Sequence, residues 1–279
     1  MTTATLIRPA GVRPDLTGPP VATRTPAAAL RTTIAQSVAM AWRGLVKVSR
    51  TPEQYADVVL QPVIFTLMFG YLFGGAVAGS VRDYLPMLIP GILVMSLITA
   101  STVTGTQLRE DMDEGVFDRF RSLPISRVAP LAGGLLADVV RYVIAATLTM
   151  VMGVIMGWRP TLGGAVASAL LVIVCAWAVS WIFALLGVSA RSASAVQGMS
   201  ALVLFPLTFL SNSFVPVTTL PGWLQGFVQV NPMSHVVTAV RELTAGGTGG
   251  PDVLWALLGA AIVIAVFAPL AVRGYMRKV

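Results

Sequence analysis

Charged side chains are scarce in this sequence: only 11% of its 279 residues are Asp, Glu, Lys or Arg, whereas 56% are hydrophobic. A soluble domain carries about 25% charged residues. Residues 192–240 contain no Asp, Glu, Lys or Arg at all, and the mean hydropathy of the chain is +0.80. The composition excludes an ordinary soluble protein and predicts an integral membrane protein.

Residues that support catalysis are also scarce. The only lysines are Lys47 and Lys278, and neither directly follows a glycine, which excludes the Gly-Lys-Ser/Thr loop of a P-loop ATPase. The single histidine, His235, excludes a multi-histidine metal site. The single cysteine, Cys175, cannot form an intramolecular disulfide. We therefore expect this chain to have no catalytic site, no metal and no cofactor of its own.

Long apolar windows are abundant, and a membrane-spanning helix needs about 20 apolar residues. These windows are continuous and do not alternate as barrel strands do, so they indicate helices. The sequence predicts an all-α membrane protein with six transmembrane helices at about 58–78, 87–107, 132–156, 165–187, 196–215 and 253–272. Within the third of these, Asp138 and Arg141 lie three residues apart and are expected to pair with each other.

The uncharged stretch 192–240 is too long for one transmembrane helix, and its prolines break it too often for two. We predict that the fifth helix is followed by a re-entrant or interfacial hairpin on the outer side of the membrane. Apolar residues at helical spacing give part of this hairpin one hydrophobic face. It either closes an external exit or only covers the helix ends. Its candidate gate residues are Pro216, Pro221, Trp223, Asn231 and Pro232.

The distribution of basic residues predicts the orientation, because short cytoplasmic loops collect Lys and Arg. Most of them lie before the first helix, in the second and fourth loops and in the C-terminal tail, whereas the opposite side holds only Arg82, Arg159 and Arg241. Both termini are expected to be cytoplasmic, which requires an even number of spans. This rule also accounts for the net charge of +7, so we expect no nucleic-acid partner.

The N-terminal section divides into two parts. Residues 1–27 are rich in proline and have no apolar run long enough for a signal peptide, so we predict a disordered cytoplasmic tail. Residues 28–52 have apolar side chains at helical spacing, with Arg43, Lys47 and Arg50 on another face. This pattern predicts an amphipathic helix in the membrane interface. The remaining residues, 53–279, form the transmembrane domain.

The most charged segment of the chain is residues 109–127, in the second loop. Val116, Phe117, Phe120 and Leu123 form a short apolar stripe there, between a glycine and a proline. The pattern is compatible with a solvated loop or with a short helix, at about 113–124, that contacts a soluble partner.

Three segments carry a resemblance to a known family. They are residues 205–216 (Phe-Pro-Leu-Thr-Phe-Leu-Ser-Asn-Ser-Phe-Val-Pro), 220–224 (Leu-Pro-Gly-Trp-Leu) and 231–234 (Asn-Pro-Met-Ser). Their order and spacing resemble the permease subunits of type-2 ABC exporters. The loop sequence Arg-Ser-Leu-Pro-Ile-Ser-Arg at 121–127 is similar to that of daunorubicin-resistance type drug-export permeases. The resemblance extends from about residue 28 to the end of the chain. One departure is Asn212, where the family often has glycine.

The resemblance implies a permease in a prokaryotic plasma membrane that pairs with a second, identical or related permease. Two separate ATPase subunits would bind ATP and Mg and would drive export. Their contact with this chain would be the coupling loop, through Glu114, Gly115, Phe117, Phe120, Arg121, Leu123 and Pro124.

The predicted spans contain few polar side chains, and the first is rich in Met and aromatic residues that adapt to varied apolar ligands. We therefore expect a hydrophobic or amphipathic cargo, either a drug-like natural product or a complex lipid. The alternatives are export of a polysaccharide or lipid-linked glycan, and an ATP-independent membrane scaffold or insertase.

Overall fold

The computed structural model describes residue 39, residues 52–115 and residues 129–278, and within these ranges the chain is helical, without strands. This confirms the predicted all-α class. The elements are α2 (Pro52–Ala78), α3 (Val81–Asp113), α5 (Ala129–Met156), α6 (Leu162–Ser189), α7 (Ala193–Phe209), the 3-10 turn η1 (Val217–Thr219), α8 (Gly222–Val230), α9 (Pro232–Thr244) and α10 (Gly250–Lys278). The tail 1–27, the predicted interfacial helix 28–52 except for its residues 39 and 52, and the loop 116–128 lie outside the described residues.

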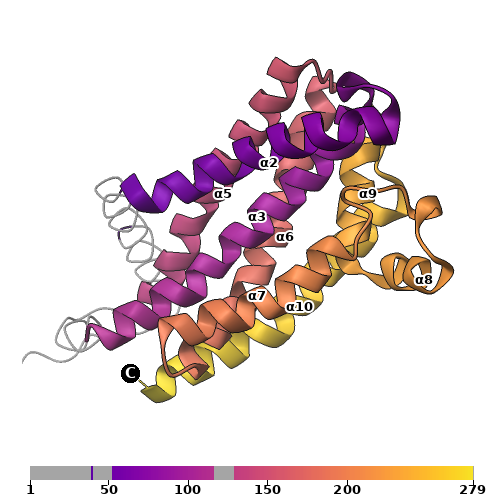
Figure 1. The fold of residues 1–279 in the computed structure, drawn as a ribbon. Coiled ribbons are helices and arrows are strands. Elements are labelled where there is room, and N and C mark those ends of the chain that lie inside the picture. Colours follow the sequence, from indigo (N-terminus) through magenta and orange to yellow (C-terminus); the bar gives the residue numbers. More distant parts are fainter. Residues whose placement is uncertain (1–38, 40–51, 116–128, 279) are drawn as a thin grey trace, which may run out of the picture.

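The longer helices run side by side between two ends of an elongated bundle (Figure 1). Within the described ranges, five stretches are long and apolar enough to cross a membrane, namely Leu60–Ala78, Val81–Asp113, Pro130–Met156, Leu162–Ser189 and Gly250–Lys278. A sixth helix, α7, is apolar but shorter. The C-terminus lies at one end of the bundle. The opposite end, which holds the turns at 79–80 and 157–161 and the segment 210–249, is called the hairpin end below.

The predicted bounds of four helices need correction. Helix α2 begins at Pro52 and not at 58, and α10 ends at Lys278 and not at 272. The fifth helix was expected at 196–215, but α7 ends at Phe209, because the buried loop that follows bonds to other parts of the protein. The second helix was expected at 87–107, but α3 is longer at both ends. It begins after Ser80, whose side chain accepts a hydrogen bond from the Asp83 amide at 3.1 Å, a typical N-cap. It ends before Gly115, whose φ of 68° lies in the left-handed region that favours glycine.

Helix α3 forms the centre of the bundle, where it contacts α2, α5, α6, α7 and α9. It crosses α6 very closely at a pair of glycines. A Cβ atom added at Gly105 would lie 2.3 Å from the carbonyl oxygen of Phe183, and one added at Gly187 would lie 2.3 Å from the carbonyl oxygen of Gly105. Small residues let helix backbones approach in membrane proteins, where packing replaces the hydrophobic effect as the driving force.

The outer helices present large apolar side chains on their exposed faces. Examples are Leu72 on α2, Ile155 on α5, Leu202 on α7 and Leu254 on α10, each at least 66% exposed. Such extensive exposed apolar surface is unusual for a soluble monomer and suits a lipid environment. The packing therefore agrees with the composition: α3 is enclosed, and the surrounding helices turn apolar faces outward.

Candidate functional site

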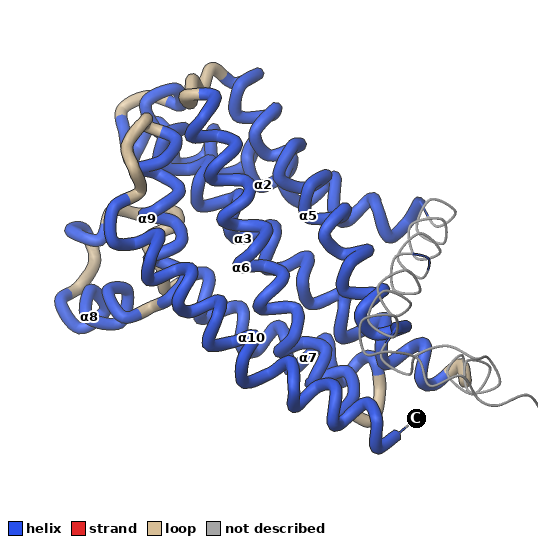
Figure 2. The backbone as a smooth tube through the Cα atoms, turned by 180° about the vertical axis from the view of Figure 1, so that it is seen from behind, coloured by secondary structure: helices blue, strands red, loops and turns tan. Residues whose placement is uncertain are grey.

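The segment after α7 folds back at the hairpin end of the bundle. It consists of a loop at 210–216, which we call the hairpin loop, then η1, α8 and α9. Helix α9 packs against α3, α6 and α10, whereas α8 lies at the periphery of the molecule (Figure 2). With 9 and 13 residues, α8 and α9 are too short to cross a bilayer, which takes about 20 residues.

Asn231 connects three pieces of this segment. Its side-chain oxygen accepts a hydrogen bond from the Met233 amide at 2.9 Å and so caps α9, with Pro232 at the first helical position, which favours proline. Its Nδ2 atom donates to the carbonyl oxygens of Leu207 at 2.9 Å and Leu210 at 2.8 Å. These carbonyls belong to the end of α7, where helical partners run out. One buried side chain therefore fixes the end of α7 relative to the start of α9.

Arg241 anchors the hairpin loop to α3. Its Nη2 atom donates to the carbonyl oxygens of Asn212 at 2.6 Å and Ser213 at 3.2 Å, and also to that of Met87 at 3.1 Å. None of the ion pairs within the described residues involves Arg241, so backbone carbonyls take the place of a carboxylate. Burial lowers the pKa of Arg241 to about 10, which still leaves the guanidinium cationic at neutral pH. The bonds satisfy irregular backbone that would otherwise be buried without partners.

Further contacts fix the same loop. The hydroxyl of Tyr84 donates to the carbonyl oxygen of Phe214 at 2.7 Å. Gly91 approaches the loop so closely that an added Cβ would lie 2.3 Å from the carbonyl oxygen of Ser213. The Nδ2 atom of Asn212 donates to the hydroxyl of Thr238 on α9 at 2.9 Å. No described residue other than glycine has a positive φ, so the asparagine at position 212 needs no left-handed backbone, and its side chain adds a bond that glycine lacks.

The five residues expected at the gate therefore lie in different environments. Asn231 is buried, Pro216 is half-buried, and Pro221, Trp223 and Pro232 are exposed. Trp223 is 78% exposed on α8, on the apolar face predicted from the spacing. The structure brings Asn231 and Pro232 together with the end of α7, but it leaves Trp223 on the outer surface, where an indole suits the membrane–water boundary.

The predicted pair between Asp138 and Arg141 on α5 is present. Their side chains lie 2.8 Å apart and both are almost fully buried. The second carboxylate oxygen of Asp138 accepts a hydrogen bond from the hydroxyl of Thr104 on α3. Charged groups buried in a membrane protein are costly unless paired, and this pair also joins α5 to α3.

The end of α3 carries the first residues of the expected coupling loop. Arg109 forms an ion pair with Asp113 one turn later, and its Nη1 atom donates to the carbonyl oxygen of Ala190 at 3.1 Å. Arg109 therefore joins the end of α3 to the turn between α6 and α7. Glu114 and Gly115 follow directly, at the C-cap. The other coupling residues, Phe117, Phe120, Arg121, Leu123 and Pro124, lie outside the described residues, as do Arg43, Lys47 and Arg50.

The sequence interpretation missed the anchors of the hairpin loop. Arg241 was noted only as a rare basic residue on the outer side, and Tyr84 and Gly91 were not singled out. A signal was available for Arg241, because an arginine that follows a long uncharged stretch needs a buried partner or access to water. Helix α9 was also missed, although Asn-Pro is a combination of N-cap and first helical residue.

Comparison with known proteins places this arrangement in a family. The profile of the ABC-2 type transporter matches residues 35–244. Over 249 residues, 88% of each chain, the sequence is 47% identical to the daunorubicin resistance ABC transporter permease protein DrrB1 of Streptomyces coeruleorubidus.

More distant relatives match over most of their length. The probable doxorubicin resistance ABC transporter permease protein DrrC of Mycobacterium tuberculosis is 26% identical over 89% of this chain and 91% of its own. The inner membrane transport permease YadH of Escherichia coli is 24% identical over 70% of this chain and 78% of its own. The extent of these matches, together with the helical fold, shows that the chain is a membrane permease of the ABC-2 type transporter family.

Proposed function

We propose that this chain is the permease subunit of an ATP-driven exporter that moves a hydrophobic or amphipathic, drug-like compound out of the cytoplasm or the inner leaflet. The observation that carries this proposal is the 47% identity, across 88% of the chain, to a daunorubicin resistance permease. At this identity and coverage we expect a cargo of the same chemical class. The chain itself is not the enzyme, and ATP and Mg are bound by two separate ATPase subunits.

The proposed topology has six spans, with α7 as the fifth and both termini in the cytoplasm of a prokaryotic cell. The bundle supports it, because successive long helices run in alternating directions and the C-terminus lies opposite the hairpin end. Helix α7 has 17 residues and a length of about 26 Å at 1.5 Å per residue. A hydrocarbon core of about 30 Å then leaves the hairpin loop near its outer edge, as an interfacial or re-entrant segment.

Coupling to the ATPases is proposed at the loop after α3. Glu114 and Gly115 end the central helix of the bundle, so a push on this loop would act directly on the element that contacts most of the other helices. The apolar stripe with Phe117 and Phe120 supplies a surface for a soluble partner. Residues 28–52 would lie in the membrane interface beside it, preceded by the tail 1–27.

The exit is proposed at the hairpin end, between this chain and a second, identical or related permease. The hairpin loop is fixed to α3 and α9, the helices that would transmit movement from the coupling loop. The segment from Pro216 to Pro232 then closes the outer side between transport cycles.

The function is tested by purifying the tagged chain gently from its native membrane and measuring ATP hydrolysis in the eluate. We expect an ATPase to co-elute with the chain. The charge reversal Arg121→Glu should abolish this association or uncouple it from daunorubicin export, while Arg127→Glu in the same loop serves as a matched control of charge. Well-folded permease without any associated ATPase would contradict the proposal and favour an ATP-independent membrane protein.

A further inference from the structure

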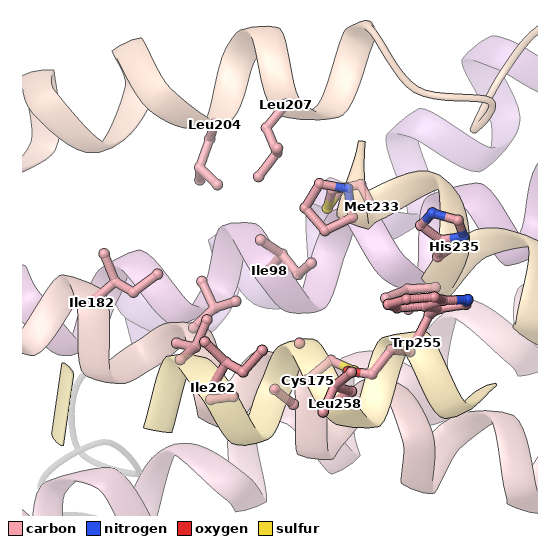
Figure 3. Close-up of a pocket in the computed structure, with 18 of the residues that line it drawn as sticks. Ile98, Cys175, Ile182, Leu204, Leu207, Met233, His235, Trp255, Leu258 and Ile262 are labelled. Atoms are coloured by element: carbon pink, nitrogen blue, oxygen red, sulfur yellow. The ribbon is translucent and has the colours of Figure 1, made fainter. Parts of the chain in front are cut away.

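An apolar pocket of about 680 Å³ lies between α7 and α10, with residues of α6, α8 and α9 and one residue of α3 completing its wall (Figure 3). Small-molecule sites have volumes of about 300–1,000 Å³. The wall consists mainly of aliphatic, aromatic and sulfur-containing side chains, and none of the residues that line it is Asp, Glu, Lys or Arg. A pocket of this size and polarity suits the hydrophobic body of a lipid-soluble molecule.

The pocket has one polar end. His235 of α9 and Trp255 of α10 lie close together there (Figure 3), with ring centroids 6.5 Å apart, and Gln229 also lines the wall. The Nδ1 atom of His235 lies 2.6 Å from a carboxylate oxygen of Asp252. Since an ionised carboxylate only accepts, Nδ1 donates this hydrogen bond; in the tautomer that carries its single proton on Nδ1, the Nε2 atom is left as an acceptor.

This end selects for the charge of the ligand. An acceptor nitrogen backed by a carboxylate favours a group that donates hydrogen bonds, and the face of an indole attracts cations. An anionic ligand would meet no Lys or Arg among the described residues that line the pocket. The arrangement therefore distinguishes an amphipathic amine from a fatty acid or another anionic amphiphile.

We propose that the pocket between α7 and α10 binds an amphipathic amine, with its hydrophobic body among the apolar side chains and its protonated nitrogen beside His235 and Trp255. That the bound amine is the exported cargo rests on the proposed function; that the pocket binds it does not. Binding itself requires neither ATP nor the ATPase subunits, so it is measured separately from transport.

Gly259 of α10 offers a way to fill the pocket without disturbing the backbone. It lines the wall, and a Cβ added there would meet no other atom within 4 Å. Gly259→Phe therefore places a ring in the pocket. Gly134→Phe is the matched control, because Gly134 has the same open surroundings on α5 and does not line the pocket.

The test measures binding of daunorubicin, a planar aromatic amine, by fluorescence anisotropy with the full chain in lipid nanodiscs and with empty nanodiscs as the reference for partition into lipid. We expect saturable binding that Gly259→Phe weakens at least tenfold and Gly134→Phe leaves unchanged. Asp252→Asn should weaken daunorubicin binding about tenfold and leave the uncharged N-acetyldaunorubicin unaffected, since only the amine senses the carboxylate.

Two results would overturn the assignment. One is a dissociation constant that is the same for Gly259→Phe and Gly134→Phe, with both variants showing native helix content and a single size-exclusion peak. The other is a signal no larger than that of empty nanodiscs. In either case, an ATPase that still co-purifies with the chain would leave the export function intact, so the two failures are distinguishable.

Discussion

The Nη2 atom of Arg241 lies 2.6 Å from the carbonyl oxygen of Asn212, and this contact ties the second short helix of the hairpin segment to the loop after α7. The same nitrogen also bonds to α3 through Met87. A single cation with no carboxylate partner in the described structure therefore joins three parts of the chain that are far apart in sequence. A lysine could not replace it fully, because an ammonium lacks the planar fork of donors.

Replacing Arg241 by methionine should destabilise the hairpin end. The change leaves three carbonyl oxygens without their donor, and hydrogen bonds to a charged group contribute about 1.5–3 kcal/mol each, without being additive. We expect a loss of about 2–4 kcal/mol, seen as a lower midpoint of thermal unfolding in detergent, with Arg241→Lys in between. Arg159→Met is the control, since Arg159 lies exposed at the same end. Equal midpoints for Arg241→Met and Arg159→Met would contradict the anchoring role.

Gly91→Ala tests the approach of α3 to the hairpin loop. In an open helix, replacing glycine by alanine stabilises by about 1 kcal/mol. At Gly91 the new methyl group would lie 2.3 Å from the carbonyl oxygen of Ser213, so the loop must move, and we expect both unfolding midpoint and export to fall. Gly75→Ala on α2 has free space and should be neutral or stabilising. If the two variants unfold at the same temperature, the close approach does not matter for stability.

Much of the fold could be predicted because the membrane imposes a simple rule: long apolar windows must be helical. The third and fourth helices lie within about three residues of their predicted positions at both ends, since charges and glycines mark these ends. Most errors in the predicted helix ends occur outside the apolar windows, where the membrane does not constrain the backbone. Helix α3 extends to Asp113 because Arg109 and Asp113, four residues apart, support a helical turn beyond the membrane.

The conformation of the hairpin loop could not be predicted from the sequence. Residues 210–215 are uncharged and mostly apolar or small, so their composition favours a continued helix. Their actual conformation depends on partners up to 130 residues away in sequence, such as Tyr84 for the carbonyl of Phe214. Contacts of that kind leave no local pattern. The presence of a hairpin could therefore be predicted from its prolines, but the way it is anchored could not.

The buried pair on α5 should behave non-additively. Asp138→Ala leaves Arg141 buried without its carboxylate partner, and breaking a buried pair costs about 3–5 kcal/mol. The double variant Asp138→Ala/Arg141→Ala removes both charges and should recover a large part of that loss. Membrane level and thermal midpoint of the two single variants and the double variant form the measurement. Additive losses would mean that the two side chains act independently, despite the 2.8 Å between their charged atoms.

The two roles considered for the hairpin segment can be separated with Trp223 and Asn231. Trp223 is 78% exposed, so Trp223→Ala should leave the thermal midpoint unchanged. A loss of export in this variant would then show that the hairpin segment takes part in closing the exit. Asn231 is buried and bonds to both Leu207 and Leu210. Asn231→Ala should therefore lower the free energy of unfolding by about 1–3 kcal/mol, which is seen as a lower thermal midpoint, and should reduce export as a consequence.

The decisive measurement is export by Trp223→Ala and by Pro221→Ala, normalised to the amount of protein in the membrane. A gate predicts that export falls at normal stability, because these residues lie on the part of the segment that packs least against the bundle. A segment that only covers helix ends predicts unchanged export in both variants and a loss in Asn231→Ala alone. That second pattern would rule out gating by α8 and leave the hairpin segment with a structural role.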